Sequence, residues 1–554
     1  MKNSAMLHRD LHQLTSDLAG LVTLIKGVPE FFAERVTLER AKEQIRKDLD
    51  NRENRFLDVV RSSIYEHETS PYLKLLRFAG CEYADLQTQV RRSGLEETLG
   101  QLAGEGVYLT SEEFKGKKEV VRGAHSFRVT PADFNRPRSS GGYRTQSSGT
   151  TNQPIRSFVS LDLLAIRTPA TCLAFAAHDL FSRAHAMYDS ILPGSAGINN
   201  LMIYARMGVL TDRWFARTMP IKNKLERIYH SCTTRLLVQA ARYCGAGFPK
   251  PEYVQSHEVE KIVQWLSARQ SQRKHCCITT AASNAARIAR AAHNLGISLQ
   301  GSRFIVTGEP LTDSKREVIE KAGATAIPRY AFGGSINIGY GCANRDHTDE
   351  IHVNQHLLAL ITNPHRAAGA GSPIHPLLCT TIDPLFPRLL LNVESGDYGY
   401  LVRRDCGCAL ENAGLSLHLH HIRSFEKFTS EGMNFFYGDL YDLFERIFPG
   451  EFGGGPGDYQ LVEEEDATGQ TRLVLVVHPE VKELDETRIL ARLRFELSKY
   501  SRGNRFMTDV WSNAGTFELK RAVPHASPRG KILPLHMSAS PLAASGSSRN
   551  ISRR

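Results

Sequence analysis

Residues 282–332 read ASNAARIARAAHNLGISLQGSRFIVTGEPLTDSKREVIEKAGATAIPRYAF, and this stretch decides the fold class of the 554-residue chain. Its small residues predict a helix that ends near Gly296, and an apolar strand should follow over 304–307. The next pattern predicts a helix from about Asp313 to Ala322, followed by another short strand. This alternation of helices and short strands is typical of an α/β protein with a largely parallel sheet.

The chain before this stretch should begin as a set of helices. Over residues 1–115, apolar residues recur at three- and four-residue steps among charges, as in LERAKEQIRKDLDNRENRFLDVV. Thr110 and Glu113 have the spacing of a capping box and predict the start of a further helix. We therefore expect a helical lead-in over 1–115 that packs on a large domain over 116–423.

Just after residue 448 glycine and proline become frequent, which indicates turns and the start of a different region. The segments YQLVEEE and TRLVLVVHP predict a β-hairpin, residues 485–499 an amphipathic helix, and residues 516–519 a last strand. We expect a small α+β domain over 424–536 and a disordered tail over 537–554.

Composition narrows the class of protein. Hydrophobic residues make up 41% and charged residues 23%, as in soluble globular proteins, and no apolar run is long enough to cross a membrane. The net charge of +10 is spread along the chain, so we expect no nucleic-acid partner. The first residues are too polar for a secretory signal, and ten cysteines are too few for a disulfide scaffold. These features predict a cytoplasmic protein with reduced thiols and no membrane partner.

A loop rich in hydroxyl groups is the first chemical motif. Residues 147–154 read SSGTTNQP, with four hydroxyl groups and a glycine in the first five positions. Such a loop can wrap an anion with side-chain and backbone donors, and glycine permits a close approach of the backbone. It lacks the lysine of a Walker loop, and a plain linker is the alternative interpretation.

This loop resembles the phosphate loop S-S-G-T-T-G-x-P of the adenylate-forming enzymes. The branch that it resembles contains phenylacetate–coenzyme A ligase and the acyl-protein synthetases. The resemblance continues in order from about Ser70 to Lys531, which makes a chance match improbable. The main matching segments are TGEPL (307–311), FGGSINIGYG (332–341), ESGD (394–397), RSFE (423–426) and PRGK (528–531).

The resemblance implies a nucleotide site and three catalytic residues. Lys531 would stabilise the negative charge that builds when a carboxylate attacks the α-phosphate of ATP, a task that suits a point charge on a flexible stem. Asp397 and Arg423 would bind the ribose beside the hinge into the small domain. The residues expected to contact the nucleotide are Ser147, Ser148, Gly149, Thr150, Thr151, Gly308, Glu309, Pro310, Phe332, Gly333, Ser335, Asp397 and Arg423.

The sequence departs from the family pattern at positions that matter for Mg²⁺. Ile336 stands where the family has a glutamate that helps to hold the ion, and an isoleucine offers no oxygen ligand. Glu394 replaces the arginine of R-T-G-D, and Asn152 replaces a glycine of the phosphate loop. Either Glu394 or Glu309 substitutes for the lost carboxylate, or metal binding is weak, or adenylation is lost and the protein only binds a nucleotide or acyl group.

A second constellation consists of cysteines and histidines. Three thiolates and one imidazole suit a tetrahedral Zn²⁺ ion, and some relatives in this branch have a similar pattern. The alternative is a set of buried or free thiols. The histidines of the HLHH run at 418–421 could also crowd a metal, but a strand with outward polar faces is the favoured interpretation. The candidate zinc ligands are Cys342, Cys406, Cys408 and either His347 or His352, with His352 preferred.

Together these features predict an ATP-dependent ligase that activates a carboxylic acid as its acyl-adenylate. Coenzyme A is the expected acceptor, with a carrier-protein thiol, a protein cysteine or an amine as alternatives. The expected cofactors are ATP, Mg²⁺, coenzyme A and a structural Zn²⁺. The expected partners are a small carboxylic acid, with an acyl-carrier protein or a second copy of the chain as further candidates. The acid pocket should draw on 172–180, 281–284 and 332–334, whose small apolar residues favour an aromatic or alkyl acid, with an amino acid as the alternative.

Overall fold

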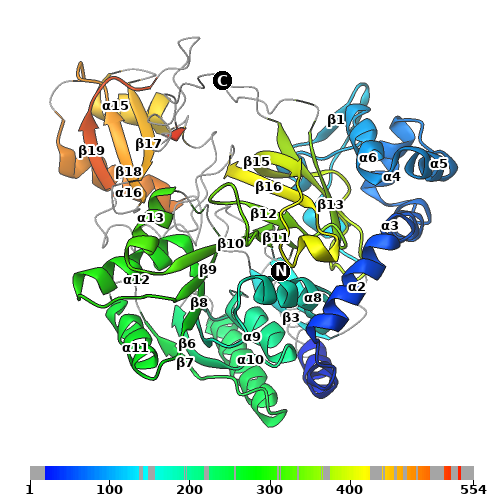
Figure 1. The fold of residues 1–554 in the computed structure, drawn as a ribbon. Helices are drawn as coiled ribbons and strands as arrows, with labels where there is room; N and C mark the ends of the chain where they lie inside the picture. The colour runs from blue at the N-terminus through cyan, green and yellow to red at the C-terminus, as the bar shows by residue number, and fades with distance from the viewer. Residues whose placement is uncertain are drawn as a thin grey trace, which may run out of the picture.

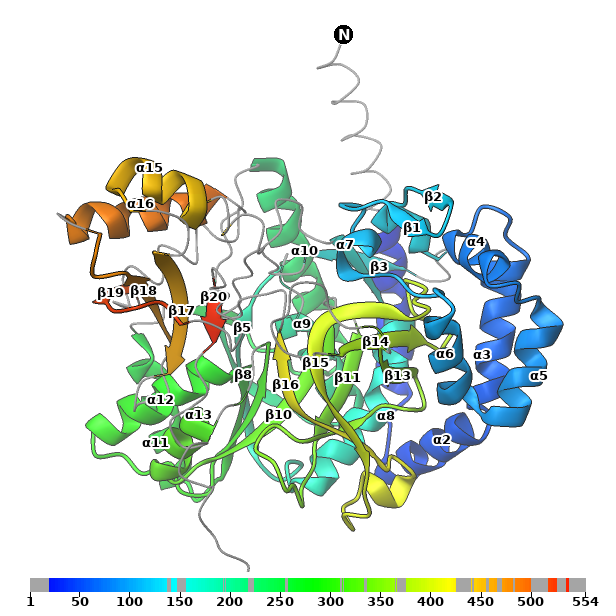
Figure 2. The ribbon, with the colours of Figure 1, turned by 90° about the horizontal axis from the view of Figure 1, so that it is seen from above.

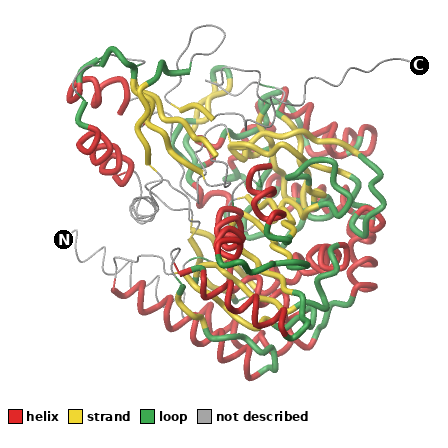
Figure 3. Tube along the Cα trace, turned by 60° about the vertical axis from the view of Figure 1, so that its left-hand side comes forward, coloured by secondary structure: helices red, strands yellow, loops and turns green. Residues whose placement is uncertain are grey.

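The computed structural model shows a large sheet with helices packed around it and a smaller sheet set to one side (Figure 1). The helices surround the strands of the large sheet (Figure 3). The residues that the structure describes are 19–136, 141–146, 156–192, 194, 196–217, 224–254, 258–308, 311, 313–332, 336–363, 365, 375–424, 440, 443–454, 458–465, 471–481, 484–499, 517–525 and 535–537.

Half of the large sheet is parallel. The described residues form a twelve-stranded sheet, and neighbouring strands run parallel from β10 to β7. The segments predicted at 304–307 and just after residue 322 are neighbours in this half, which confirms the parallel α/β unit. In sheet order the parallel strands are β10 (Thr325–Phe332), β9 (Arg303–Thr307), β8 (Cys276–Ala281), β5 (Ala184–Ser190), β6 (Thr211–Arg217) and β7 (Pro251–Tyr253).

Helices cover both faces of this parallel half. Along β8, Cys276 and Ile278 enter one apolar core while Cys277 enters the other, because successive residues of a strand point to opposite faces. The first core also receives α11 (Glu260–Ser271), α12 (Ala282–Asn294) and α13 (Asp313–Lys321). The second core receives α8 (Leu161–Ala177), α9 (Ala196–Arg206) and α10 (Lys224–Tyr243).

The other half of the sheet is antiparallel. Strand β10 pairs parallel with β9 on one side and antiparallel with β11 on the other, so the change of direction occurs at β10. This half extends the predicted parallel sheet with strands that the alternating pattern of 282–332 does not contain. Its strands, in sheet order, are β11 (Ile336–Gly341), β12 (Ile351–Val353), β16 (Leu417–Ser424), β15 (Val393–Arg403), β14 (Pro376–Thr381) and β13 (Leu358–Thr362).

The predicted N-terminal helices are present and pack beside the antiparallel half (Figure 2). The capping box is confirmed, because Thr110 Oγ1 accepts the amide of Glu113 and the Glu113 carboxylate accepts the amide of Thr110. The buried Asn392 side chain donates to the carbonyls of Leu99 and Val107 at 2.9 and 3.1 Å and so joins the helices to the sheet. The helices are residues 19–33, α2 (Leu38–Asp50), α3 (Arg52–Val60), η1 (Arg61–Tyr65), α4 (Pro71–Phe78), α5 (Tyr83–Ser93), α6 (Leu95–Gly104) and α7 (Ser111–Phe114).

Short elements connect the helices to the large sheet. A small hairpin and a 3₁₀ turn come first, and a second antiparallel hairpin, β3–β4, precedes α8. Among the described helices, none combines the length and apolar character needed to cross a membrane. These elements are β1 (Val120–Arg122), β2 (His125–Phe127), η2 (Pro131–Phe134), β3 (Gly142–Gln146) and β4 (Arg156–Ser160).

The C-terminal part has a four-stranded sheet in the order β19-β18-β17-β20 among the residues described. The predicted hairpin is confirmed, since β17 and β18 pair antiparallel with Tyr459 opposite Val477. The expected domain boundaries remain predictions, and the tail over 538–554 lies outside the described residues. The elements are η5 (Leu443–Ile447), α15 (Phe448–Phe452), β17 (Tyr459–Glu465), β18 (Thr471–Val477), α16 (Glu486–Lys499), β19 (Phe517–Arg521) and β20 (Leu535–Met537).

Candidate active site and metal centre

The carboxyl ends of β8, β9 and β10 lie at one edge of the sheet, because these three neighbouring strands run parallel. The segments predicted to line the nucleotide and acid pockets directly follow these ends, at 282–284, 308–311 and 333–335. Gly308 has a φ of +88°, so the chain turns sharply as it leaves β9. In open α/β sheets, ligands bind outside the carboxyl ends of the strands, which makes this edge the candidate nucleotide site.

A hydrogen bond brings Asp397 to the same edge. The hydroxyl group of Tyr330, two residues before the end of β10, donates to Asp397 Oδ2 at 2.6 Å. Burial raises the pKa of Tyr330 far above its usual value, so the phenol stays protonated and acts as the donor. The backbone amide of Asp397 donates to Ser395 Oγ at 3.1 Å across Gly396, whose φ is +82°. The predicted ribose-binding carboxylate is therefore oriented by the strand that ends beside the adenine segment.

Much of the predicted nucleotide site lies outside the described residues. The hydroxyl loop begins after β3 and ends before β4, and Gln146 pairs with Arg156, so an antiparallel hairpin carries it. The backbone of Arg423 pairs with Tyr398, next to Asp397, but its side chain is not described. The predicted residues outside the description are Ser147, Ser148, Gly149, Thr150, Thr151, Glu309, Pro310, Gly333, Ser335 and Lys531.

Two of the three positions that depart from the family pattern, Ile336 and Glu394, are described, and both are buried. Ile336 is the first residue of β11, is only 4% exposed and packs in the same apolar core as α8. Glu394 is also 4% exposed, and its Oε2 accepts the backbone amide of Ser111 at the start of α7, at 3.1 Å. A carboxylate at a helix N-terminus is favourable. This placement favours a structural role for Glu394 over the predicted binding of Mg²⁺.

Two arginines lie in the interior beside the segments expected to form the acid pocket. Arg167 on α8 and Arg329 on β10 are each 8% exposed. The guanidinium of Arg329 donates to Asn200 Oδ1 at 2.9 Å. Among the described residues, no hydrogen bond or ion pair is found for the Arg167 guanidinium, and burial together with the nearby Arg329 lowers its pKa. The interior here is therefore more polar than the small residues of 172–180 indicate.

Four of the five predicted metal ligands converge in the antiparallel half. Cys342 follows β11, His352 lies on β12, and Cys406 and Cys408 follow β15. Among the described residues, the three Sγ atoms and one histidine nitrogen all lie within 4.8 Å of one another. His352 Nε2 is 3.1 Å from Cys408 Sγ and 3.6 Å from Cys406 Sγ. Tetrahedral zinc with bonds of about 2.3 Å to sulfur and 2.0 Å to nitrogen places such atoms about 3.6 Å apart, so the set fits a closed zinc site.

The orientation of His352 is fixed by its other ring nitrogen. His352 Nδ1 lies 2.6 Å from the carbonyl oxygen of Leu415, which only accepts, so Nδ1 carries the proton. This tautomer leaves Nε2 unprotonated toward the thiols, as metal-binding histidines require. A hydrogen bond from the thiol of Cys342 lowers the pKa of Cys408, and His352 lowers it further. The cluster therefore favours a thiolate.

A buried ion pair between Glu350 and Arg404 lies next to the cysteine cluster. Glu350 Oε1 accepts from Arg404 and lies 2.6 Å from His418 Nδ1, and the Arg404 guanidinium also lies 3.8 Å from Cys342 Sγ. Burial alone would raise the pKa of Glu350, but hydrogen bonds from His418 and Arg404 and from two backbone amides hold it well below its usual value. If the cluster held a divalent ion, the positive charge of Arg404 would also offset the excess negative charge of three thiolates around it.

His347 does not belong to this cluster. Its ligand nitrogen groups instead with His420 and His421, on the exposed side of the sheet. The HLHH run is indeed in a strand, but the predicted outward polar faces are wrong for His418, which is fully buried beside Glu350. The buried carboxylate explains this, because it gives an inward-facing imidazole a hydrogen-bond partner.

The sequence analysis missed three residues that support these sites: Tyr330, Glu350 and Arg404. Each acts on a partner more than 50 positions away, so no local spacing reveals it. The one available signal was chemical, because Glu350 lies between the two candidate ligands His347 and His352. A carboxylate among metal ligands is a common supporting partner.

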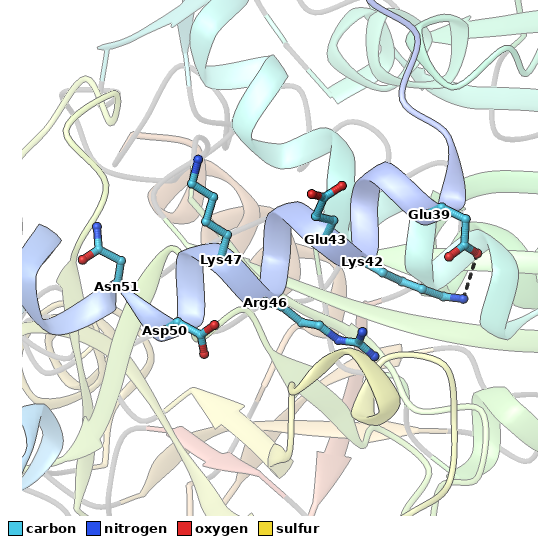
Figure 4. A pocket seen from close by; sticks show the side chains of 7 residues that line it. All are labelled: Glu39, Lys42, Glu43, Arg46, Lys47, Asp50 and Asn51. Atoms are coloured by element: carbon cyan, nitrogen blue, oxygen red, sulfur yellow. Dashed lines mark hydrogen bonds and ion pairs between the residues drawn. The ribbon is translucent and has the colours of Figure 1, made fainter.

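A shallow depression on α2 is separate from the nucleotide edge (Figure 4). Three acidic and three basic side chains line it together with Asn51, and Lys42 forms an ion pair with Glu39 at 3.1 Å. Arg46 donates to the carbonyl of Asn412 at 3.0 Å, in the turn that follows the Cys-x-Cys segment, which contains η4 (Glu411–Ala413). The depression therefore marks where α2 attaches to the turn after the Cys-x-Cys segment, and its charges are mixed. Its lining residues are Glu39, Lys42, Glu43, Arg46, Lys47, Asp50 and Asn51.

Comparisons with known proteins give structural likeness at low similarity. No protein-family model and no curated protein sequence matches the chain. The structure is similar to an anthranilate CoA ligase in complex with anthranoyl-AMP, at 10% identity and a TM-score of 0.33, over 71% of this chain and 65% of that one. It is also similar to an amide bond synthetase from Marinactinospora thermotolerans, at 12% identity and a TM-score of 0.38, over 84% of this chain and 92% of that one.

A third solved structure, the o-succinylbenzoate CoA synthetase from Bacillus subtilis, matches at 10% identity and a TM-score of 0.33. This match covers 70% of this chain and 94% of the synthetase. Because the TM-scores are low, the functional argument rests on the residues of this chain.

Proposed function

We propose that this protein is an ATP-dependent ligase that activates a carboxylic acid as its acyl-adenylate and passes the acyl group to a thiol, with coenzyme A as acceptor. In this proposal the enzyme is a phenylacetate–CoA ligase-like, AMP-forming acid–thiol ligase. One observation supports it: two segments with family motifs, 307–311 and 332–341, begin at the carboxyl ends of the neighbouring parallel strands β9 and β10, and Asp397 is hydrogen-bonded to Tyr330 of β10.

The proposed first step joins the acid to AMP. A carboxylate oxygen attacks the α-phosphorus of ATP, the bond to the bridging oxygen breaks, and pyrophosphate leaves with that electron pair. The hydroxyls of Ser148, Thr150 and Thr151 hold the β- and γ-phosphates with Mg²⁺, and Lys531 stabilises the charge at the α-phosphate. Asp397, with Arg423, holds the ribose and so fixes the α-phosphate relative to the acid.

In the proposed second step the acceptor replaces AMP. The thiolate sulfur attacks the acyl carbonyl, the bond to the phosphate oxygen breaks, and AMP leaves as the anion. Transfer to a carrier-protein thiol, a protein cysteine or an amine follows the same course with a different nucleophile. The small domain presents Lys531 for the first step and withdraws it for the second, turning near Glu426.

We further propose that Cys342, His352, Cys406 and Cys408 hold one structural Zn²⁺ ion. Four protein ligands fill a tetrahedral site, so the ion takes no part in catalysis. Bound there, it would join the turn after β11, strand β12 and the turn after β15.

ATP–pyrophosphate exchange across a panel of aryl, alkyl and amino acids tests the proposal. We expect exchange that depends on one class of acid and on Mg²⁺, followed by AMP release when coenzyme A is added. AMP release with an amine or a carrier protein, but not with coenzyme A, would change the acceptor. ATP binding without exchange for any acid would mean that the protein binds a nucleotide but is not a ligase. Ile336, which offers no oxygen ligand for Mg²⁺, motivates this alternative.

Two variants address the observation that carries the proposal. Asp397→Asn should weaken ATP binding, and Tyr330→Phe should do so less, because it removes only the donor that orients the carboxylate. Tyr253→Phe is the matched control, since this tyrosine is 53% exposed on the far edge strand β7. Unchanged ATP affinity in Asp397→Asn would remove the carboxylate from the site.

A further inference from the structure

We propose that His347, His420 and His421 form a second, solvent-facing site for a divalent transition metal, separate from the cysteine cluster. Among the described residues, one nitrogen from each ring lies within 4.8 Å of the other two. The proposal does not depend on the ligase function, because it rests on side chains of the antiparallel half alone.

The three rings are closely arranged. His420 Nδ1 and His421 Nδ1 share a hydrogen bond of 2.6 Å, which a bound ion would replace. The ring centroids of His347 and His420 are 4.0 Å apart at 22°, and those of His347 and His421 are 4.8 Å apart at 63°. Three imidazoles around one point are a common ligand set for zinc and suit copper and nickel.

A β-bulge is the reason why two consecutive histidines converge. Successive side chains of a regular strand point to opposite faces, so His420 and His421 would normally diverge. Strands β15 and β16 pair at Tyr398–Arg423 and again at Tyr400–His420. Between these two pairs β15 has one residue and β16 has two, so β16 carries the extra residue of the bulge. His421 is one of these two residues of β16, and its backbone adopts a left-handed φ of +52°. Bulges re-aim side chains and are frequent beside functional sites.

A buried carboxylate stabilises this backbone. The side chain of Asp349, 5% exposed, accepts the backbone amides of His421 at 2.9 Å and Ile422 at 3.0 Å. Asp349 lies two residues after His347 in the turn before β12, so the same turn provides one ligand and fixes the backbone at a second, His421. The site is thus positioned from two directions by residues outside it, as designed metal sites need.

The histidine site differs from the cysteine cluster in how far its ligands are exposed to solvent. His347 and His421 are exposed and His420 is half-buried, whereas three of the four members of the cysteine cluster are buried. Three nitrogen ligands leave coordination positions open to water or to a small external ligand. We therefore infer a labile site that exchanges its metal while the cysteine cluster retains zinc.

Titration calorimetry with Ni²⁺ tests the inference on the full chain. The protein is first treated with a weak chelator, and its zinc content is measured to establish that the cysteine cluster stays filled. We expect one further equivalent of Ni²⁺ to bind with micromolar affinity. Absence of Ni²⁺ binding to zinc-loaded protein overturns the proposal.

Variants locate the ion. His347→Ala and His421→Gly should each weaken Ni²⁺ binding at least about tenfold, since even a lost supporting partner costs 10–100-fold. Glycine keeps the positive φ at position 421, which guards against misfolding. His293→Ala, at an exposed histidine on α12, should bind Ni²⁺ as the wild type does. Unchanged affinity in His347→Ala, or equal loss in His293→Ala, contradicts the assignment.

Spectroscopy gives a second readout. Co²⁺ added to the zinc-loaded protein should show the ligand-field bands of nitrogen and oxygen ligands without thiolate charge-transfer bands. Thiolate bands that appear while zinc is retained would place the added ion at the cysteines and overturn the proposal.

Discussion

The two halves of the large sheet build sites in different ways. In the parallel half, the segments predicted to bind the nucleotide and the acid begin at the carboxyl ends of β8, β9 and β10. In the antiparallel half, the candidate metal ligands are brought together by cross-strand pairing, as when His352 lies opposite both Tyr340 and His418. An edge of loops leaves room for a ligand and a second domain, whereas paired strands hold side chains in place before any metal arrives. Changes in one half should therefore affect activity, and changes in the other should affect metal content and stability.

The largest expected effect is on the loop-built site. Lys531→Ala should reduce adenylate formation by roughly 10²–10³-fold, the cost of losing one charge-stabilising donor. Zinc content and melting temperature should stay as in the wild type. Pyrophosphate exchange with saturating acid, together with a thermal melt, measures both. Exchange near the wild-type rate would remove Lys531 from the mechanism.

The second effect concerns the strand-built cluster. Cys408→Ser should lower zinc affinity by about a hundredfold, so that zinc falls from about one per chain to near zero after dialysis, and should lower the melting temperature. Elemental analysis and calorimetry provide the measurement. Cys232→Ser, at an exposed cysteine on α10, is the matched control and should change neither. A full zinc complement in Cys408→Ser would exclude this site.

A smaller effect is expected from the ion pair behind the cluster. The pKa of Glu350 is depressed in the folded protein, so its contribution to stability is present above the unfolded value near 4.5 and is lost as the pH falls toward the folded value. Below about pH 4.5 the free energy of unfolding should therefore decline less steeply in Glu350→Gln than in the wild type. Zinc affinity should also fall by roughly 10–100-fold. Denaturant melts at several pH values test this, with the exposed Glu39→Gln as control. Parallel pH curves for Glu350→Gln and wild type would contradict it.

The smallest expected effect is a difference in stability between variants of two buried arginines beside the predicted acid pocket. Arg167→Met should leave the free energy of unfolding within about 1 kcal/mol of the wild type or raise it. Among the described residues no carboxylate pairs with this buried cation, and an unpaired buried charge is costly. Arg329→Met should be destabilising by about 1–3 kcal/mol, because it leaves Asn200 without its donor. Denaturant unfolding of both variants checks the ranking, and a larger loss in Arg167→Met would reverse it.

Local sequence patterns predicted individual helices and strands well, but they did not predict which distant segments pair in the sheet. The helix–strand alternation of 282–332, the capping box at Thr110 and the hairpin after Tyr459 each depend on residues a few positions apart. The antiparallel half depends instead on pairing between segments such as 351–353 and 417–424, for which the sequence carries no marker.

The candidate sites show the same division. Resemblance identified the ligands Cys342, Cys406 and Cys408, but only strand register decides between His347 and His352. The extra residue that turns His421 toward His420 is invisible in an alternating HLHH pattern, because a bulge is defined by the partner strand. The acidic partner of His418 was likewise hidden by distance along the chain.

The attachment of the first helices to the large sheet has a consequence for biosynthesis. The carbonyl of Leu99 on α6 receives its donor from Asn392, which is 293 residues later in the chain. At about 5–20 residues per second, a ribosome takes roughly 15–60 s to make that intervening length. During this interval helix α2 can already pack on α8, but α6 lacks its partners β13 and Asn392. A nascent chain arrested before β14 should therefore be a strong client for chaperones, and its release from them should coincide with the emergence of the antiparallel strands.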